Sequence, residues 1–556
     1  MKFIFVSGGV ISGLGKGITT ASIAMLLESH GIRVAPIKCE AYMNVDSGTI
    51  RPQEHGEVFV LDDGLEGDQD LGNYERFLGR DLTKENFVTN GQIYQEIIRK
   101  ERAFEYHGED VEIVPHVPEE MIRRFKQAGK KYKADVVIIE VGGTVGEYQN
   151  VLFIEANRIM KYRDKEDVIH IHLGYLPTPA FLGEMKSKPV QTSVRILSGT
   201  GIMPDFIVGR AEKEIDDKRK ERLAWLCNID GENVISNPDV DTIYRIPEIF
   251  KKQDFDKKIM AKLGLKSKKN DYKKWHDFLQ KVDSLKKTVK IAIVGKYFNI
   301  GDYVLPDSYI SVIEAIKHGA WANGVKPEFT FINCEEYESD AKSISTLKEF
   351  DGVVIPQGWG SRGVEGKIAA IKYLREHKIP YLGLCFGMQM AVIEFARNVC
   401  GLKNANSEEV DEKTKNPVIH IMPNQKEYLA KYQYGGTIRL GAYPCLIKSG
   451  TVLEGVYLNQ LKTKNLKLKT TTENSKLIIS ERHRHRYEFN NEYRGIMEKK
   501  GLVISGTSPD GELVEAVELP KSVHPFFVGV QSHPEYKSHP LSPHPIFVEF
   551  IKATIK

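Results

Sequence analysis

The stretch SGGVISGLGKGITT, residues 7–20, decides the fold of the first half of the chain. An apolar run from Phe3 to Val6 precedes it and predicts a buried strand, and apolar residues at helical spacing follow from Ile18 to Leu27. Five glycines lie within residues 8–17, with Lys16 at the expected start of the helix. Glycines let backbone N–H groups approach phosphate oxygens, and the helix N-terminus and the lysine add positive charge. This order favours a nucleotide phosphate site over a turn that only joins a strand to a helix.

The loop departs from the standard phosphate-binding pattern. That pattern has four residues between its glycines and Ser or Thr after the lysine, whereas five residues separate Gly9 from Gly15 here and Gly17 follows Lys16. The motif is therefore a deviant P-loop.

Length and composition limit the class of protein. A chain of 556 residues is expected to hold about two to four domains. The net charge of +3 gives no reason to expect a nucleic-acid partner. We expect no signal peptide, and the sequence has no long apolar run, so we expect no membrane partner. The six cysteines lack CxxC spacing, which argues against a disulfide framework or a structural zinc site. We expect a cytoplasmic protein that acts on small molecules.

Strand-like and helical segments alternate along the first half. The strand-like runs are Val34 to Ile37, Val111 to Val114, Val136 to Ile139, Val168 to His172 and Phe206 to Val208. Helical patterns such as Ile93 to Phe104 lie between them. This alternation predicts a parallel sheet covered on both faces, with ligands at the carboxyl ends of its strands.

Carboxylates follow two of these strands. Glu140 comes directly after Val136 to Ile139, and Asp70 lies beyond the strand-like Val58 to Val60. A nucleoside triphosphate needs Mg²⁺, which takes oxygen ligands and is usually held by one or two carboxylates. Glu140 and Asp70 are the predicted ligands, and a surface carboxylate at a strand end is the alternative for Glu140. For Asp62, Asp63 and Asp68 we expect solvated turn residues.

A charged segment, EMKSKPVQTSVR, carries Lys186, Lys188 and Arg195. Its charge alone leaves a solvated loop and an anion site equally open.

Together with GGVISGLGKG, VDSGTIRPQEHGEVFVLDDG, DLGNYERF, EVGGTVGE and GIMPD, this segment makes the chain resemble the CTP synthase family over its whole length. The resemblance implies a phosphate- and ATP-binding set of Gly13, Leu14, Gly15, Lys16, Gly17, Ile18, Lys38, Asp70, Pro238, Asp239 and Val240, with Mg²⁺ on Asp70 and Glu140. It implies a UTP and CTP set of Ser12, Glu147, Tyr148, Gln149, Lys186, Ser187, Lys188, Pro189, Val190, Gln191 and Arg222. His55 would line and gate a passage for ammonia.

The chain departs from the family pattern at a few positions of this half. Glu147-Tyr148-Gln149 replaces a more usual Asp-Ile-Glu at a position that contributes to CTP binding, and Arg222 falls where lysine is common. We expect the departure at 147–149 to alter product inhibition more than catalysis.

A nucleophile motif lies in the second half, which begins with the strand-like KIAIVG at Lys290. Cys385 stands between Gly383 and Gly387, after a strand and before a helix, as in a nucleophile elbow. The alternative is a buried core cysteine. The segment QSHPEY supplies His533 and Glu535 after another strand-like run, and a cysteine nucleophile needs such a base and a carboxylate that orients it. These residues predict a Cys-His-Glu triad.

The second half also resembles class I glutamine amidotransferase domains. The resemblance makes Cys385 the nucleophile, His533 the general base and acid, and Glu535 its orienting carboxylate. It implies that the glutamine site comprises Gly358, Phe386, Gly387, Met388, Gln389, Glu409 and Arg486, with Gly358 in the oxyanion hole. PQG at 356–358 replaces the usual PGG. GGTIRLG around Arg439 resembles a mobile lid linked in the family to GTP activation. ERHRHRYEFN, residues 481–490, is a family motif, which weakens its interpretation as an RNA-binding patch.

The resulting prediction is an α/β protein with two three-layer domains. Residues 1–265 form a deviant P-loop amidoligase domain like dethiobiotin synthetase, 266–288 a lysine-rich linker, and 289–556 a class I glutaminase domain. The expected activity is the ATP-dependent amination of UTP to CTP through 4-phosphoryl-UTP, with ammonia from glutamine, Mg²⁺ as cofactor, GTP as activator and CTP as inhibitor. A homotetramer, with filaments in addition, is expected by resemblance. The alternatives are another amidoligase and glutaminase fusion, such as one that amidates a cobyrinic acid, and a P-loop switch or filament scaffold.

Overall fold

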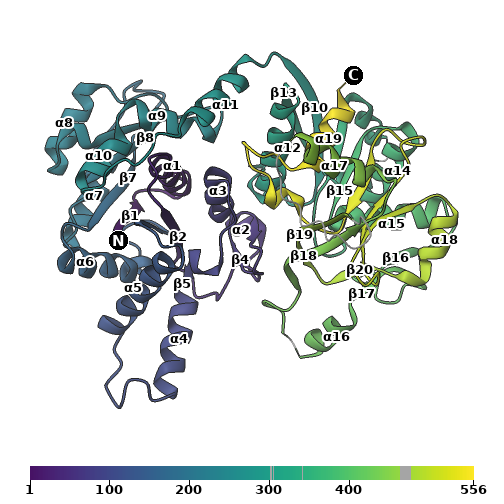
Figure 1. Cartoon of the computed structure of the whole chain (residues 1–556), viewed down its shortest axis with the longest axis horizontal. Coiled ribbons are helices and arrows are strands. Elements are labelled where there is room, and N and C mark those ends of the chain that lie inside the picture. The colour runs from purple at the N-terminus through teal and green to yellow at the C-terminus, as the bar shows by residue number, and fades with distance from the viewer. Residues whose placement is uncertain (301–302, 305, 341, 432, 464–476, 556) are drawn as a thin grey trace. The chain divides into compact units, whose positions relative to one another are not determined.

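The computed structural model describes residues 1–556 except 301–302, 305, 341, 432, 464–476 and 556. The chain divides into two compact units (Figure 1). The first unit comprises Met1–Ser47 and Asp70–Gln280, and the second comprises Gly48–Gln69 and Lys281–Lys556. The chain therefore leaves the first unit for 22 residues, from 48 to 69, before it returns.

The first unit is built on a parallel sheet. Within the described residues the sheet has seven strands in the order β5-β2-β6-β1-β7-β8-β9. They are β1 (Lys2–Gly8), β2 (Val34–Glu40), β5 (Phe87–Thr89), β6 (Val136–Val141), β7 (Val168–Tyr175), β8 (Phe206–Ala211) and β9 (Val234–Pro238). All their pairings are parallel. The strands read as continuous apolar runs because helices cover both faces of the sheet, and the carboxyl ends of β1, β2 and β6 lie side by side.

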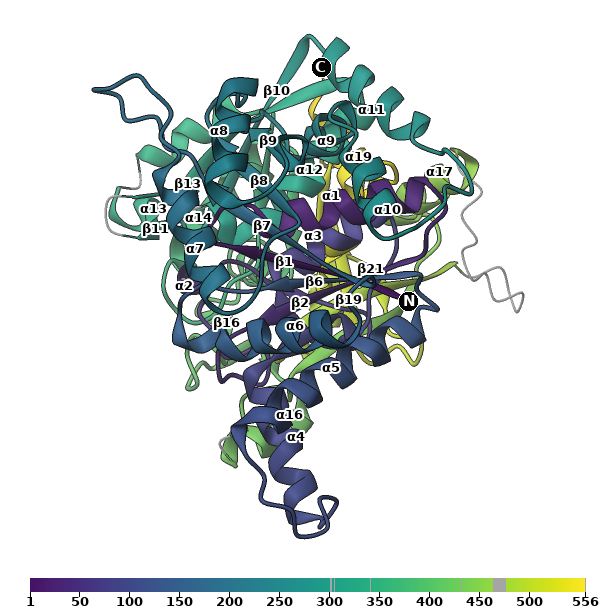
Figure 2. The same cartoon turned by 90° about the vertical axis from the view of Figure 1, so that its left-hand side faces the viewer.

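Helices lie on both faces of this sheet. They are α1 (Lys16–Ser29), α3 (Gln69–Leu78), α4 (Asn90–Arg102), α5 (Ile113–Lys131), α6 (Val151–Arg163), α7 (Lys188–Gly199), α8 (Asp217–Cys227), α9 (Ile246–Lys252), α10 (Phe255–Lys262) and α11 (Lys273–Ser284). Phe125 of α5 and Phe153 of α6 share one core cluster with Phe5 of β1. Figure 2 shows α5 and α6 on one side of the sheet and α1, α9 and α10 on the other, while the far end of α4 protrudes from it.

One predicted strand is wrong. Residues 111–114 form no strand in the described chain, and α5 begins at Ile113. Val114 has extended dihedral angles but is solvent-exposed, with no ladder partner among the described residues. Pro115 follows it, and the residue before a proline favours an extended conformation whether or not a sheet is present.

The second unit has a mixed sheet. Within the described residues it has nine strands in the order β13-β10-β14-β15-β23-β22-β21-β18-β19. They are β10 (Lys287–Gly295), β13 (Val325–Asn333), β14 (Gly352–Ile355), β15 (Tyr381–Leu384), β18 (Arg439–Ile447), β19 (Leu477–His485), β21 (Val503–Thr507), β22 (Val514–Glu518) and β23 (Phe527–Val530). The pairings from β13 to β23 are parallel and those from β23 to β19 are antiparallel. Among the described residues, short strands form three small separate sheets: β3 (Val58–Val60) with β4 (Glu66–Asp68), β11 (Asn299–Ile300) with β12 (Tyr303–Val304), and β16 (Ala405–Ser407) with β17 (Asn416–Ile421) and β20 (Tyr487–Phe489).

The α-helices of the second unit, within the described residues, are α2 (Pro52–His55), α12 (Ile310–Ala322), α13 (Glu336–Ser339), α14 (Val364–His377), α15 (Phe386–Asn398), α16 (Pro423–Ala430), α17 (Val452–Thr463), α18 (Arg494–Lys499) and α19 (Pro545–Thr554). Two hydrophobic clusters lie between these helices and the sheet. α14 and α15 contribute Ile371 and Ile393 to one cluster, and α12 and α19 contribute Ile316 and Phe550 to the other. Both units thus have the three-layer α/β architecture that the sequence predicted.

Residues 48–69 are integrated into the second unit. Phe59 packs edge-on against Tyr536, with ring centroids 4.9 Å apart, and Tyr536 donates to the carbonyl of Val58 at 3.0 Å. Asp62 accepts hydrogen bonds from the buried Arg482 and from Lys537. Asp68 is also buried, at 4% exposure. The expectation of solvated turns is therefore wrong for Asp68 and for the partly shielded Asp62, because protein groups surround them.

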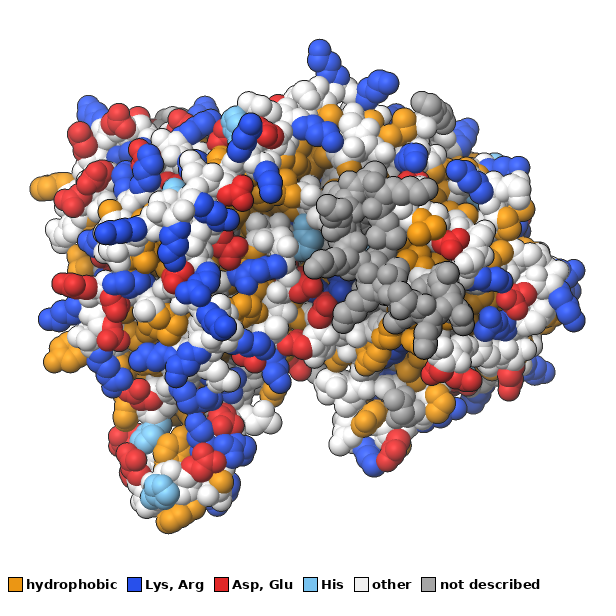
Figure 3. All heavy atoms as spheres, viewed as in Figure 1, with side chains coloured by type: hydrophobic (Ala, Val, Ile, Leu, Met, Phe, Trp, Pro, Cys, Tyr) orange, Lys and Arg blue, Asp and Glu red, His pale blue; other side chains and the backbone are white. Residues whose placement is uncertain are grey.

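The surface mixes charges of both signs. On the face drawn in Figure 3, Lys and Arg side chains are interspersed with Asp and Glu side chains. Across the described part of the chain, no helix combines the length and the apolar character that a membrane crossing requires.

Candidate active sites

Cys385 occupies a strained turn between β15 and α15. Its φ of 51° is unusual for a residue other than glycine. The turn is possible because glycines flank it at close approaches: a Cβ on Gly387 would stand 2.0 Å from the carbonyl oxygen of Ile355. The Cys385 amide donates to the carbonyl of Val530 at 2.7 Å, which ties the turn to β23. This local structure is a nucleophile elbow.

The loop after β23 brings a base to the cysteine. Nδ1 of His533 lies 2.7 Å from Oε1 of Glu535, and both side chains are buried. Burial alone lowers the pKa of His533, but the charges of Glu535 and Cys385 outweigh it and raise that pKa to about 10. An imidazolium beside the sulfur favours the thiolate, which is the nucleophilic form. The Nε2 of Gln531 also donates to the sulfur at 3.5 Å.

A narrow cavity surrounds the sulfur within the second unit. Its lining includes Cys385, His533, Gly358, Phe386, Gln389, Glu409 and Arg486. Glu409 accepts from the Gly360 amide at 2.7 Å, and burial raises its pKa. Nη1 of Arg486 is buried with no partner among the described residues. A carboxylate and an unpaired guanidinium nitrogen are suited to the amino and carboxylate groups of an amino acid.

Two residues predicted for glutamine binding stand outside this lining. Gly387 packs against Ile355, and the side chain of Met388 is fully buried in the core beneath α15. Their backbone at the start of α15 holds the elbow.

The basic stretch 481–490 points into the second unit rather than to solvent. Arg482 is 0% exposed and lies over the ring of Phe59, and Arg484 pairs with Glu66 at 2.7 Å. His483 and His485 are buried, and burial holds both pKa values well below the usual range. These side chains join residues 48–69 to the wall of the cavity at Cys385.

The glycine-rich loop joins β1 to α1 in the first unit. Gly15, the residue before the helix, has φ of 82°, and Gly13 has φ of 72°. A Cβ on Gly17 would stand 1.8 Å from Oδ1 of Asp70, so a larger residue here would displace the Asp70 carboxylate. Lys16 donates to the carbonyl of Gly143 at 2.8 Å, and burial together with Lys38 lowers its pKa.

Two carboxylates and a lysine meet beside this loop. Nζ of Lys38 lies 2.5 Å from Asp70 and 2.9 Å from Glu140, and the side chains come from three adjacent elements, β2, α3 and β6. Burial and the charge of Asp70 raise the pKa of Glu140 to about 7, although Lys38 and Lys16 oppose the rise. Concentrated negative charge with oxygen donors suits a hard divalent cation such as Mg²⁺. The donor set therefore fits the predicted metal.

The other predicted nucleotide residues lie on several elements of the first unit. Pro238 ends β9, and Asp239 and Val240 follow it, at the same edge of the sheet as the end of β1. Ser187 and Lys188 begin α7, where Gln191 donates to Ser187 at 2.9 Å and Lys186 pairs with Glu184 at 2.5 Å. Val190 is buried, whereas Tyr148 is 96% exposed. Ser12 lies in the glycine-rich loop, Glu147 and Gln149 flank Tyr148, and Arg222 is on α8.

Tyr74 is a contributor that the sequence analysis missed. Its hydroxyl donates to Glu140 from α3, and its side chain is fully buried. It stands one helical turn after Asp70 in DLGNYERF, so helical spacing could have placed it on the same face.

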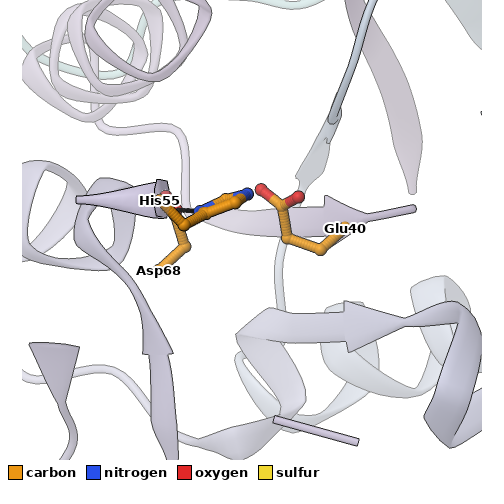
Figure 4. Close-up of side chains that lie close together, drawn as sticks. All are labelled: Glu40, His55 and Asp68. Atoms are coloured by element: carbon orange, nitrogen blue, oxygen red, sulfur yellow. Dashed lines mark ion pairs between the residues drawn. The ribbon is translucent and has the colours of Figure 1, made fainter. Parts of the chain in front are cut away.

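His55 lies at the end of α2 in the second unit. Its Nδ1 is 3.2 Å from Oδ2 of Asp68. Figure 4 labels these two side chains and Glu40, which ends β2 in the first unit.

Comparisons with known proteins cover the whole chain. The family described as CTP synthase N-terminus matches residues 2–265, and glutamine amidotransferase class-I matches residues 304–553. The CTP synthase of Caldanaerobacter subterraneus subsp. tengcongensis is 46% identical over 555 residues, which are 100% of this chain and 98% of that protein. The CTP synthase of Carboxydothermus hydrogenoformans is 47% identical over 556 residues, 100% of this chain and 99% of that one. Among solved structures, the glutaminase domain of Trypanosoma brucei CTPS with bound acivicin is 34% identical, with a TM-score of 0.41, and covers 48% of this chain and 93% of that one.

A deviant P-loop unit joined to a class I glutaminase unit defines a glutamine-dependent amidoligase. Identity over the full length narrows that class, and the chain belongs to the CTP synthase family. It makes CTP from UTP with nitrogen from glutamine and uses ATP as a substrate. The predicted family and activity are confirmed, and a cobyrinic acid amidating enzyme is not favoured.

Proposed function

We propose that Cys385, His533 and Glu535 carry out the hydrolysis of glutamine. The Cys385 thiolate attacks the amide carbon, and the tetrahedral oxyanion accepts hydrogen bonds from the backbone N–H groups of Gly358 and Phe386. His533 protonates the departing nitrogen, the C–N bond breaks, and ammonia leaves while the glutamyl group stays on Cys385 as a thioester. His533 then takes a proton from water, and hydroxide attack on the thioester releases glutamate. The carrying observation is the 2.7 Å contact between His533 and Glu535 beside an elbow cysteine.

In the first unit we propose that Lys16 and Lys38 neutralise charge during phosphoryl transfer from ATP. Oxygen at C4 of UTP is a poor leaving group, and the transferred phosphoryl group turns it into a good one. Ammonia then attacks C4 and phosphate leaves, so that CTP remains. Lys16 is held at the N-terminus of α1, and Lys38 lies between the two carboxylates. Asp70 and Glu140 would hold Mg²⁺, which supplies charge neutralisation and orients the phosphates.

For UTP and CTP we propose the residues at 186–191 together with Ser12, Arg222 and 147–149. Support comes from the family motif KSKPVQ and from the start of α7, whose N-terminus favours anions. CTP would share part of this site, and residues 147–149 would set the strength of its inhibition.

His55 is proposed to line the passage that ammonia takes between the two reactions. Ammonia must travel unprotonated, because ammonium has no lone pair, and an enclosed route keeps it from the surrounding water. The ion pair with the buried Asp68 supports a fixed position for the His55 ring.

GTP is proposed to bind a second cavity beside the glutamine site. This cavity has a volume of about 690 Å³, is lined by Arg51, Tyr434 and Ile438, and shares Trp359, Glu409, Arg484, Arg486 and Tyr487 with the cavity at Cys385. Arginines and aromatic rings suit the phosphates and the base of a purine nucleotide. Residues 435–441, which resemble the family's lid, flank it.

The assembly is proposed to be a homotetramer that also forms filaments. Large apolar side chains of the first unit are exposed, among them Phe104 at 66%, Phe181 at 87% and Trp225 at 80%. Such side chains mark surfaces that another copy can cover. We further propose a cytoplasmic location, and domain limits of 1–265, 266–288 for the linker and 289–556.

The division of labour is tested by Cys385→Ala in the full-length enzyme. We expect glutamine-dependent CTP formation to fall at least about 10³-fold, because covalent catalysis is lost. Synthesis from free ammonia should keep the wild-type rate, since ammonia bypasses Cys385. CTP formation followed by absorbance, with each nitrogen source in turn, measures both. A folded variant that failed with ammonia as well would contradict the assignment.

A further inference from the structure

Residues 356–360 carry the Gly358 amide that we proposed for the oxyanion hole, and buried side chains hold nearly every carbonyl of this segment. Lys367 donates to Pro356 O at 2.9 Å, and the Tyr309 hydroxyl donates to Gln357 O at 3.3 Å. Lys296 donates to Trp359 O at 2.6 Å and to Gly360 O at 2.8 Å. We call residues 356–360 the oxyanion loop.

These bonds determine where the amides of the loop point. A trans peptide is planar, and its C=O and N–H point in opposite directions. The bond from Tyr309 to Gln357 O therefore directs the Gly358 N–H, and the bond from Lys367 to Pro356 O directs the Gln357 N–H. Neither amide has a hydrogen-bond partner among the described residues. The peptide between Trp359 and Gly360 is held at both ends, by Lys296 and by Glu409.

The two lysines are unusual as buried cations. Lys367 is 0% exposed and Lys296 1%, and within the described chain neither forms an ion pair with a carboxylate. Their ammonium groups lie 5.3 Å and 4.6 Å from the ring centroid of Phe386, the residue after Cys385. Burial lowers the pKa of Lys367 to about 7 and that of Lys296 to about 8. Burying cations without counter-ions is costly, and here they stand behind the place where negative charge develops during the reaction.

We propose that Lys296, Lys367 and Tyr309 are positioning residues that aim the oxyanion loop at the tetrahedral intermediate. The inference rests on the proposed roles of Cys385 and Gly358. Tyr309 sets the Gly358 amide that faces the oxyanion, and Lys367 fixes the preceding peptide, on which the position of that amide depends. Lys296 fixes the peptide that Glu409 also holds, so it links the oxyanion loop to the glutamine-binding side of the cavity.

The first test is Lys367→Met in the full-length enzyme. Loss of one oxyanion donor costs about 10²–10³ in kcat, and a donor that is only misaimed should cost about 10–10². The KM for glutamine should stay within about twofold, as should alkylation of Cys385 by iodoacetamide and CTP synthesis from ammonia. Lys372→Met, an exposed lysine on the same helix, is the matched control and should leave all four unchanged. Lys296→Met should lower kcat and also raise the KM, since it holds the peptide on which Glu409 rests.

A tetrahedral mimic separates aiming from general damage. The γ-semialdehyde of glutamate accepts the Cys385 thiolate at its carbonyl carbon: the C–S bond forms and the C=O π pair moves to oxygen, which leaves a tetrahedral oxyanion that faces the Gly358 amide while His533 remains an imidazolium. Inhibition by this aldehyde should weaken in both Lys367→Met and Tyr309→Phe, in proportion to the loss of kcat/KM in each variant. Tyr309→Phe also keeps the test available if Lys367→Met does not fold.

Two results would overturn the proposal. One is a kcat within twofold of wild type in both Lys367→Met and Lys296→Met. The other is a parallel fall of iodoacetamide alkylation and kcat, which would indicate damage to the nucleophile. Failure of the glutaminase assignment itself is a separate result, because hydrolysis would then survive Cys385→Ala.

Discussion

At the scale of single residues, the charge of Glu535 governs the protonation of His533. Burial of His533 opposes its charged form, and Glu535 at 2.7 Å together with Cys385 reverses that effect and raises the pKa to about 10. The imidazolium in turn favours the Cys385 thiolate. The carboxylate thus acts on the sulfur through the ring between them.

We predict that Glu535→Gln lowers glutaminase kcat by about 10²–10⁴-fold, the range expected when the orienting carboxylate of a triad is neutralised. Without the carboxylate charge the pKa of His533 falls from its raised value, so the imidazolium is lost at a lower pH. Because a protonated His533 is needed to release ammonia, the alkaline limb of the pH profile of glutaminase kcat/KM should shift to lower pH.

Glu512→Gln, at an exposed position, is the control for this variant and should leave the profile in place. An unshifted profile in Glu535→Gln would show that Glu535 does not set the charge of His533.

At the scale of elements, glycines decide how closely α15 approaches β14. A Cβ on Gly387 would meet the backbone oxygen of Ile355 at 2.0 Å, and a backbone atom cannot move aside as a flexible side chain can. Gly455 in α17 differs, because a Cβ there meets nothing within 4 Å. Substitution by alanine should therefore change the free energy of unfolding in opposite directions at Gly387 and Gly455.

We predict that Gly387→Ala destabilises the second unit by about 2 kcal/mol or more, as overpacking against fixed atoms does. Gly455→Ala should stabilise it by about 0.5–1 kcal/mol, the helix propensity difference between alanine and glycine. The urea concentration at which glutaminase activity is half lost measures both. Equal midpoints for the two variants would refute the close approach.

At the scale of the whole molecule, the chain sends residues 48–69 out of the first unit to pack within the second. Arg482 is fully buried and forms an ion pair with Asp62, so water does not reach the arginine side of the pair. Loss of one partner of a buried ion pair is destabilising. This segment carries His55, so its anchoring bears on the proposed passage of ammonia.

We predict that Asp62→Asn uncouples the two reactions. Glutaminase kcat should stay within about threefold, because Asp62 does not line the cavity at Cys385. Glutamate released per CTP formed should rise above one, because a loosened segment lets ammonia escape. Asp63→Asn, at the exposed neighbouring position, should keep the ratio near one. A ratio of one in Asp62→Asn would contradict the role of this anchor.

Much of the fold followed from local patterns. The glycine-rich loop and the elbow are contiguous, and so is the HPE segment with His533 and Glu535, so residue spacing alone predicted their local structures. The strands of the first sheet were predictable as apolar runs, since both faces are covered. The run at 111–114 also has apolar residues at Val111, Ile113 and Val114, but it contains Glu112, precedes Pro115 and has no ladder partner in the described chain.

Sequence by itself determined the α/β class, the two kinds of unit and the family, because each depends on residues close together in the chain or on motifs long enough to be specific. Only the tertiary structure decided that residues 48–69 pack with the second unit, that Asp68 and Arg482 are buried, and that Lys296, Tyr309 and Lys367 converge on the oxyanion loop. Those contacts join residues far apart in sequence. No local periodicity encodes them, since they arise from the packing of elements whose neighbours are set by sheet order.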